Sequence, residues 1–192
     1  MSFQMIFLKQ SNFPSKDEKE LWLLLSAEEQ AALEKIRDVS RRQIKLHTHA
    51  RLRQEAARLL RVHPKDLLFD IGEHGKPFFS QYKDLFFSLS YTKDASIIAL
   101  ADQPIGIDIE KIRPHRMRFT KNLGTAHELS VLRAAPDDLF LFYTFWTRKE
   151  AWLKLTGSGL TVPLNSFDVW EVTAAEKLSS FCKDDYCISF CM

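Results

Sequence analysis

The sequence predicts the same order of elements on each side of Pro104: a strand, then helices, then further strands. Alternating apolar residues indicate the strands, and capping boxes at Ser26 and Thr125 indicate where helices begin. Before Pro104 we expect strands over residues 3–8, 67–71, 85–90 and 96–101, and helices over 26–37 and 40–61. After it we expect strands over residues 105–110, 167–172 and 186–190, a helix from 125, and a long helix over 137–156 that Gly157 ends. This order favours an α+β fold built from two similar halves.

The composition is typical of a globular protein in a reducing compartment. Of the 192 residues, 45% are hydrophobic and 27% are charged, which excludes a disordered chain. No apolar run approaches the ~20 residues that a membrane-spanning helix needs, and residues 1–10 lack the pattern of a signal peptide. Cys182, Cys187 and Cys191 are an odd number without a CxxC pair, which argues against a disulfide framework. We therefore expect a cytoplasmic protein that has no membrane partner.

Basic residues are concentrated around the long helix predicted before Pro104. Residues 34–66 contain ten Lys or Arg residues and four acids, although the net charge of the chain is +2. At about 100° per residue, Arg42, Lys45, His49 and Arg53 fall on one side of this helix. The stripe indicates contact with an anion, whereas for any single residue a solvated helix surface is the simpler interpretation.

Two carboxylates share one face of the strand predicted over residues 105–110. Residues i and i+2 of a strand point to the same side, so Asp108 and Glu110 present two anions close together. A hard divalent cation relieves their repulsion, and magnesium typically takes one or two carboxylates plus substrate phosphates. This segment alone leaves a metal site and a solvated strand face both open.

A second charged pair lies on the helix predicted over residues 137–156. Glu150 and Lys154 are four residues apart and so lie on one face of it. They form either an ordinary surface ion pair or part of a site with Asp108 and Glu110. In the second case Glu150 is a metal ligand or a base, and Lys154 reaches a phosphate.

Taken together, these segments resemble the paired signature of the 4'-phosphopantetheinyl transferases. Residues 106–110 read Gly-Ile-Asp-Ile-Glu, and after a further 35 residues the segment 146–154 reads Trp-Thr-Arg-Lys-Glu-Ala-Trp-Leu-Lys. The resemblance extends to Gly-Lys-Pro at 75–77, to Phe-Ser-Leu-Ser at 87–90 and to Gly-x-Gly-Leu at 157–160. The chain length is similar to that of the longer, Sfp-like group, which implies a pseudo-dimer of two α+β halves. We place these halves at residues 1–103 and 104–192.

The resemblance implies an enzyme that moves the 4'-phosphopantetheine group of coenzyme A to a serine of an apo acyl or peptidyl carrier protein. By position, Asp108, Glu110 and Glu150 match the acids that bind magnesium, and adenosine 3',5'-bisphosphate is the product released. Glu150 also matches the proposed base, and Lys154 would steady or protonate the departing phosphate. Attack of a hydroxyl on a pyrophosphate does need a proton acceptor, a cation and help for the leaving group. The implied partners are coenzyme A and the carrier, without nucleic acid, and a monomer is sufficient if the cleft lies between the two halves.

Coenzyme A carries further phosphates, so the site also needs contacts away from the metal. The candidates are Arg42, Lys45, Arg53, Lys76, Ser90 and Tyr91. Lys76 matches the Gly-Lys-Pro segment that contacts the nucleotide in the family, and Ser90 matches a residue that meets the phosphates. Tyr91 stands where the family commonly has a histidine. Tyrosine donates a hydrogen bond but carries no positive charge at neutral pH.

Two alternatives from other functional classes stay open. One is a catalytically weakened homologue that binds carrier protein or nucleotide and has lost turnover because of Tyr91. The other is an RNA-binding protein that uses the basic stripe, although Asp108, Glu110 and Glu150 would repel a phosphate backbone. The resemblance does not choose among carriers for fatty-acid, polyketide and peptide synthesis.

Overall fold

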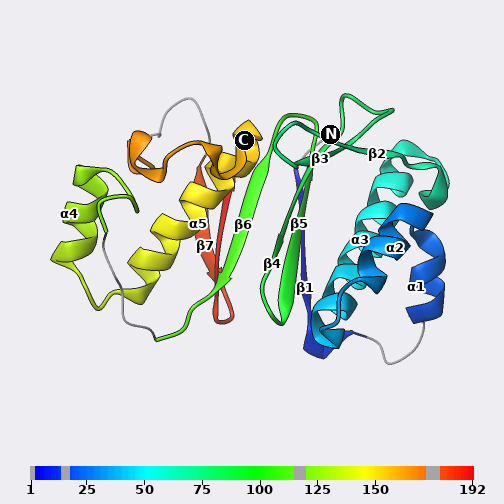
Figure 1. Ribbon diagram of the computed structural model, residues 1–192, viewed down its shortest axis with the longest axis horizontal. Coiled ribbons are helices and arrows are strands. Elements are labelled where there is room, and N and C mark those ends of the chain that lie inside the picture. Colours follow the sequence, from blue (N-terminus) through cyan, green and yellow to red (C-terminus); the bar gives the residue numbers. More distant parts are fainter. Residues whose placement is uncertain (1–2, 14–17, 115–119, 172–177) are drawn as a thin grey trace.

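The computed structural model describes residues 3–13, 18–114, 120–171 and 178–192. Its strands are β1 (Gln4–Lys9), β2 (Phe69–Ile71), β3 (Pro77–Phe79), β4 (Phe86–Tyr91), β5 (Ala95–Ala101), β6 (Gly106–Lys111), β7 (Ser179–Lys183) and β8 (Tyr186–Cys191). Its α-helices are α1 (Glu18–Leu24), α2 (Ala27–Glu34), α3 (Val39–Leu60), α4 (Ala126–Ala134) and α5 (Leu139–Thr156). In Figure 1 the strands occupy the middle of the molecule, with α1 to α3 on one side and α4 and α5 on the other.

Two antiparallel three-stranded sheets share one topology. The strand order is β1-β5-β4 in the first sheet and β6-β8-β7 in the second. In each sheet, the first strand is followed by helices and then by a hairpin of two strands. The second strand of the hairpin, β5 or β8, lies in the centre of the sheet and pairs with both the first strand and its hairpin partner. The long helices α3 and α5 occupy equivalent places in the two halves. This repeat confirms the predicted α+β pseudo-dimer, with the short pair β2-β3 as an addition to the first half.

Strand β5 joins the two halves because both of its faces are buried. All seven of its residues are buried. Ile98 and Leu100 pack into a core with Leu52 of α3, while Ile97 and Ala99 pack into a second core with strands of the other sheet. Successive residues of a strand point to opposite faces. The unbroken apolar run over residues 97–101 is therefore typical of a strand that is packed between two layers. The two sheets are therefore held in a fixed relation, which positions the groups between them.

The helix boundaries follow the signals in the sequence. Ser26 and Thr125 both form complete capping boxes, and Gly157 ends α5 in the left-handed conformation with φ of 69°. The strand predicted over residues 167–172 is wrong for residues 167–171, which form bends and turns, while Val172 lies outside the described residues. Helix α1 and strands β3 and β7 were not predicted. None of the helices in the described part of the chain is long and apolar enough to cross a membrane.

Candidate active site

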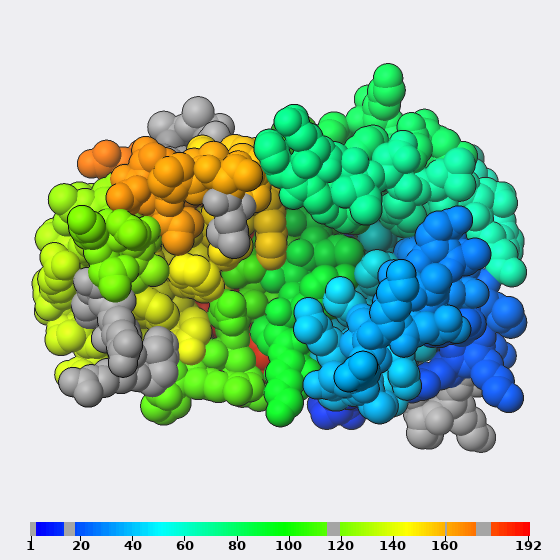
Figure 2. Space-filling view, viewed as in Figure 1, coloured from blue at the N-terminus to red at the C-terminus, as the bar shows by residue number. Residues whose placement is uncertain are grey.

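A cleft of about 660 Å³ lies where the two halves meet. The end of β4, strand β6 and helix α5 form its walls, together with the start of α3. Its lining includes Tyr91, Asp108, Glu110, Trp146, Glu150 and Lys154. Figure 2 shows the molecule hollowed between its two halves, over strands that lie deeper. The structure thus brings the two charged segments of the sequence into one site.

Gly106 explains how β6 and α5 approach each other closely enough to share this site. A Cβ atom at Gly106 would collide with the backbone carbonyl of Ala151, so only glycine allows this contact. The close approach places Glu150 and Lys154 of α5 opposite Asp108 of β6. The glycine of the Gly-Ile-Asp-Ile-Glu segment therefore has a packing role that positions the acids.

One carboxylate oxygen of Asp108 accepts two hydrogen bonds, and the other accepts none from the described residues. Its side chain is buried, and Oδ1 accepts a hydrogen bond of 2.6 Å from Ser90 Oγ and another of 2.6 Å from Lys154 Nζ. The other oxygen, Oδ2, is buried and has no hydrogen-bond partner among the described residues. A buried carboxylate oxygen without a partner is costly in free energy. A carboxylate oxygen of this kind is suited to be a ligand of a cation.

The neighbouring acids have raised pKa values. Burial, and then the charge of Asp108, raise the pKa of Glu110 to about 7, even though a hydrogen bond from Trp146 acts in the opposite direction. Burial and Asp108 also raise the pKa of Glu150. Three acids in one partly buried site therefore destabilise one another's charges, and a bound cation would relieve this.

The three acids of the cleft do not form a closed ligand set in this structure. In the described part of the chain, one group of three possible ligands has all its ligand atoms within 4.8 Å of one another, namely His127, Asp168 and Glu171. There, Asp168 Oδ2 also accepts a hydrogen bond of 2.5 Å from Thr125, the residue that caps α4. The acids of the cleft would have to move closer together around an ion.

A second cleft of about 590 Å³ adjoins the first. The two share Lys45, Leu89, Tyr91, Glu150 and Lys154 as lining residues. Lys76 also lines this second cleft, and its Nζ donates to the carbonyl oxygens of Ile105 at 3.0 Å and of Leu155 at 3.4 Å. Burial lowers the pKa of Lys76 to about 8. An anion in this cleft would therefore gain a partly desolvated cation.

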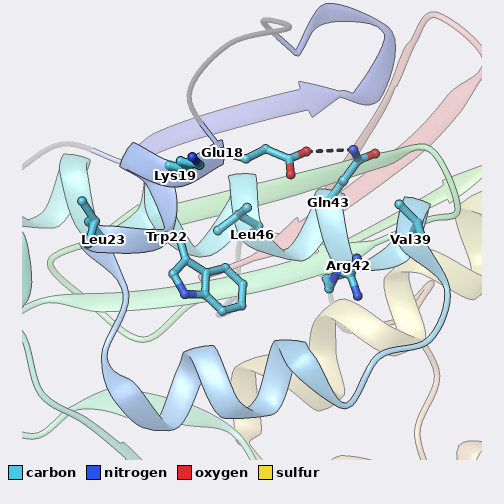
Figure 3. Close-up of a pocket in the computed structure, with 8 residues that line it drawn as sticks. All are labelled: Glu18, Lys19, Trp22, Leu23, Val39, Arg42, Gln43 and Leu46. Carbon is cyan, nitrogen blue, oxygen red and sulfur yellow. Dashed lines mark hydrogen bonds between the residues drawn. The ribbon is translucent and has the colours of Figure 1, made fainter.

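The basic residues of the predicted stripe do not all face the same part of the structure. Lys45 lines both clefts, and its Nζ lies 5.4 Å from the centre of the Tyr91 ring. Arg42 instead lines a separate pocket between α1 and α3, beside Trp22 and Leu46 (Figure 3). Arg41, which lies outside the predicted stripe, lines the first cleft. The helical angle alone did not resolve which of the neighbouring cations faces the site.

Arg53 is held inside the first half. It is 1% exposed, and its guanidinium pairs with Glu29 of α2 at 2.7 Å. The same group donates to the carbonyl oxygens of Pro64 at 2.6 Å and Leu67 at 3.1 Å. His49 contacts the other oxygen of Glu29 at 2.9 Å. These contacts fix α2 against α3 and leave Arg53 few free donors.

Comparisons with known proteins point to one superfamily of enzymes. The sequence model of the 4'-phosphopantetheinyl transferase superfamily matches residues 104–192. The chain is 36% identical over 120 residues to the 4'-phosphopantetheinyl transferase Sfp of Bacillus subtilis strain 168, covering 62% of this chain and 54% of that protein. It is 30% identical over 154 residues to the transferase psf-1 of Bacillus pumilus, covering 79% and 66% respectively. It is 39% identical over 111 residues to the transferase AcpT of Escherichia coli K12, covering 53% and 56%. The matched part thus spans about half the length of Sfp and of AcpT.

Proposed function

Because this chain belongs to the 4'-phosphopantetheinyl transferase superfamily, we propose that it transfers the 4'-phosphopantetheine group of coenzyme A to a serine of an apo carrier protein. The observation that carries the proposal is the cleft that holds Asp108, Glu110, Glu150 and Lys154 together. Phosphoryl transfer requires a metal ion, a proton acceptor and a positive charge near the leaving group. The acids of the cleft can bind the metal ion, Glu150 can accept the proton, and Lys154 carries the positive charge. Incubation with fluorescent coenzyme A, an apo carrier and magnesium tests the proposal. Binding of coenzyme A without transfer of label would support the catalytically weakened homologue instead.

We propose that the acids of the first cleft hold a magnesium ion, around which they would move closer together. The buried Oδ2 atom of Asp108 lacks a partner, and the pKa of Glu110 is raised by burial and by the neighbouring carboxylate, which are the conditions that a hard cation relieves. Asp108, Glu110 and Glu150 would hold the ion. When bound, magnesium supplies positive charge to the phosphoryl oxygens.

Glu150 is proposed to accept the proton of the carrier serine, directly or through water. The serine oxygen forms a bond to the phosphorus atom of the phosphopantetheine side, and the bond to the leaving phosphate breaks. Adenosine 3',5'-bisphosphate departs with the electron pair of that bond, and Lys154 stabilises its charge.

Coenzyme A is proposed to extend from the first cleft into the second. Lys45 and Lys76 offer ammonium groups along this path, and Tyr91 lies between the two clefts. Arg42 and Arg53 are proposed to act indirectly, by fixing α3, because they lie in a separate pocket and in the buried ion pair. Ser90 lines the first cleft, but its hydroxyl donates to Asp108 Oδ1 and so is not assigned to coenzyme A.

We also propose that one chain is sufficient and that its halves are residues 1–103 and 104–192. The cleft forms between two parts of a single chain, which supports a monomer. We propose a cytoplasmic location, which is consistent with Cys182 and Cys187 being outside any disulfide.

We predict that Glu150→Gln lowers turnover by about a hundredfold or more while changing the affinity for coenzyme A little. The amide preserves the shape of the side chain but does not accept a proton at neutral pH. Single-turnover transfer and calorimetric binding of coenzyme A separate the two effects. If affinity falls in parallel with the rate, Glu150 is mainly a ligand rather than a base.

We predict that Tyr91→His tightens the binding of coenzyme A by up to about tenfold at pH 6 and by less at pH 8. Burial raises the pKa of Tyr91, so its hydroxyl stays neutral, and Lys45 is the nearby cation. A histidine would add a charged hydrogen bond only when it is protonated, which happens at the lower pH. Dissociation constants of both proteins at the two pH values check this. An unchanged or weaker affinity at pH 6 would show that Tyr91 makes a contact of its own.

A further inference from the structure

Two serines of β4 connect the first sheet to β6. Ser88 and Ser90 are two residues apart, lie on the same face of the strand and are each 5% exposed. Ser88 Oγ accepts a hydrogen bond of 3.1 Å from the backbone N–H of Ile107, whereas Ser90 Oγ donates to Asp108 Oδ1 at 2.6 Å. The two hydroxyls are thus equally buried but have different partners, namely a backbone group and a carboxylate.

The hydrogen bond from Ser90 decides which oxygen of Asp108 is open. Oδ1 receives both donors, Ser90 and Lys154, while Oδ2 has no partner among the described residues. Lys154 has a flexible side chain that is 28% exposed, and the proposed mechanism gives it a role at the leaving phosphate. Ser90 is buried on a strand and cannot follow it. When Lys154 turns to a phosphate, Ser90 is the donor that keeps the carboxylate in place.

We propose that Ser90 is a positioning residue, whose hydroxyl holds Oδ1 of Asp108 so that Oδ2 remains directed to the cation. This inference rests on the proposed function and assigns Ser90 a role other than phosphate contact. Groups that orient a metal ligand typically change metal affinity by 10- to 100-fold when removed. Because the hydroxyl is neutral, its removal changes orientation without changing the charge of the site.

The test uses Mn²⁺ as a probe and measures its binding to the full chain by electron paramagnetic resonance, without carrier protein. We expect Ser90→Ala to weaken Mn²⁺ binding by about tenfold or more, and to leave the affinity for coenzyme A without metal unchanged. Ser88→Ala is the matched control, because it removes an equally buried hydroxyl that bonds to the backbone of β6. It should lower stability to a similar extent and leave Mn²⁺ binding unchanged.

The outcomes separate this inference from the proposed function. If the unsubstituted protein binds Mn²⁺ and Ser90→Ala binds it equally well, Ser90 does not position Asp108. Loss of metal-free coenzyme A affinity in Ser90→Ala, with Mn²⁺ binding intact, would make Ser90 a phosphate contact instead. If the unsubstituted protein binds no Mn²⁺ even in the presence of coenzyme A, the proposed metal site and the role of Ser90 both fail.

Discussion

Replacement of Asp108 by alanine is expected to lower the rate of transfer by about a thousandfold or more, which corresponds to roughly 4 kcal/mol in the activation barrier. Asp108 is buried in the cleft, and its Oδ2 is the open ligand atom of the proposed metal site. Its removal also leaves Ser90 and Lys154 without their acceptor. We expect the same direction for Glu110→Ala, because Glu110 shares the strand and the cleft.

The measurement is a single-turnover label transfer over a range of magnesium concentrations. Asp84→Ala provides a control, because Asp84 is an exposed carboxylate between β3 and β4 and does not line the cleft. The unfolding free energy of each variant shows whether the protein is still folded. If Asp108→Ala keeps a rate near that of the unsubstituted protein at every magnesium concentration, Asp108 is not a ligand of the metal ion.

The largest effect on stability is expected for Lys149→Met, which should lower the free energy of unfolding by about 3–5 kcal/mol. Lys149 and Glu128 are both 0% exposed, and Nζ lies 2.7 Å from Oε2. Lys149 also donates to the carbonyl oxygens of Leu164 and Phe167, while Glu128 accepts from the backbone N–H of Val169 at 2.7 Å. The pair therefore joins α4, α5 and residues 164–169. Removal of the lysine leaves a buried carboxylate without its counter-charge.

A double variant tests this explanation directly. Lys149→Met combined with Glu128→Gln removes both charges, so we expect it to regain a substantial part of the lost stability. Urea denaturation of the two single variants and the double variant gives the coupling free energy. If Lys149→Met changes stability by less than about 1 kcal/mol, or the effects of the two substitutions simply add, the pair does not hold these segments together.

The parts of the fold that the sequence predicts are those with strong local signals. The capping boxes at Ser26 and Thr125 and the glycine at 157 each satisfy free backbone groups within a few residues, and all three are found in the structure. The strand expected over 167–172 is absent over residues 167–171 because that segment is used differently. The backbone N–H of Val169 donates to the buried Glu128 rather than to a neighbouring strand. This partner is 41 residues away, so no local pattern indicates it.

In the candidate site, too, local patterns predicted some features and contacts between distant segments decided others. Spacing showed that Asp108 and Glu110 share a strand face and that Glu150 and Lys154 share a helix face. The resemblance to the family predicted that the two pairs meet, and all four residues do line one cleft. Helical spacing was not sufficient to predict the surroundings of Arg53, because its ion-pair partner Glu29 lies on another helix. A stripe calculated for one helix shows which side chains share a face. It does not show which of them another element covers.

The most direct test of the central claim measures both products of the proposed reaction. The protein is incubated with coenzyme A, magnesium and an apo carrier, and the intact mass of the carrier is followed together with the release of adenosine 3',5'-bisphosphate. We predict that the carrier gains one phosphopantetheine group for each bisphosphate released, that mutation of the carrier serine abolishes both, and that Asp108→Ala nearly does. Coenzyme A binding without a change in carrier mass, for each of a fatty-acid, a polyketide and a peptide carrier, would contradict the account.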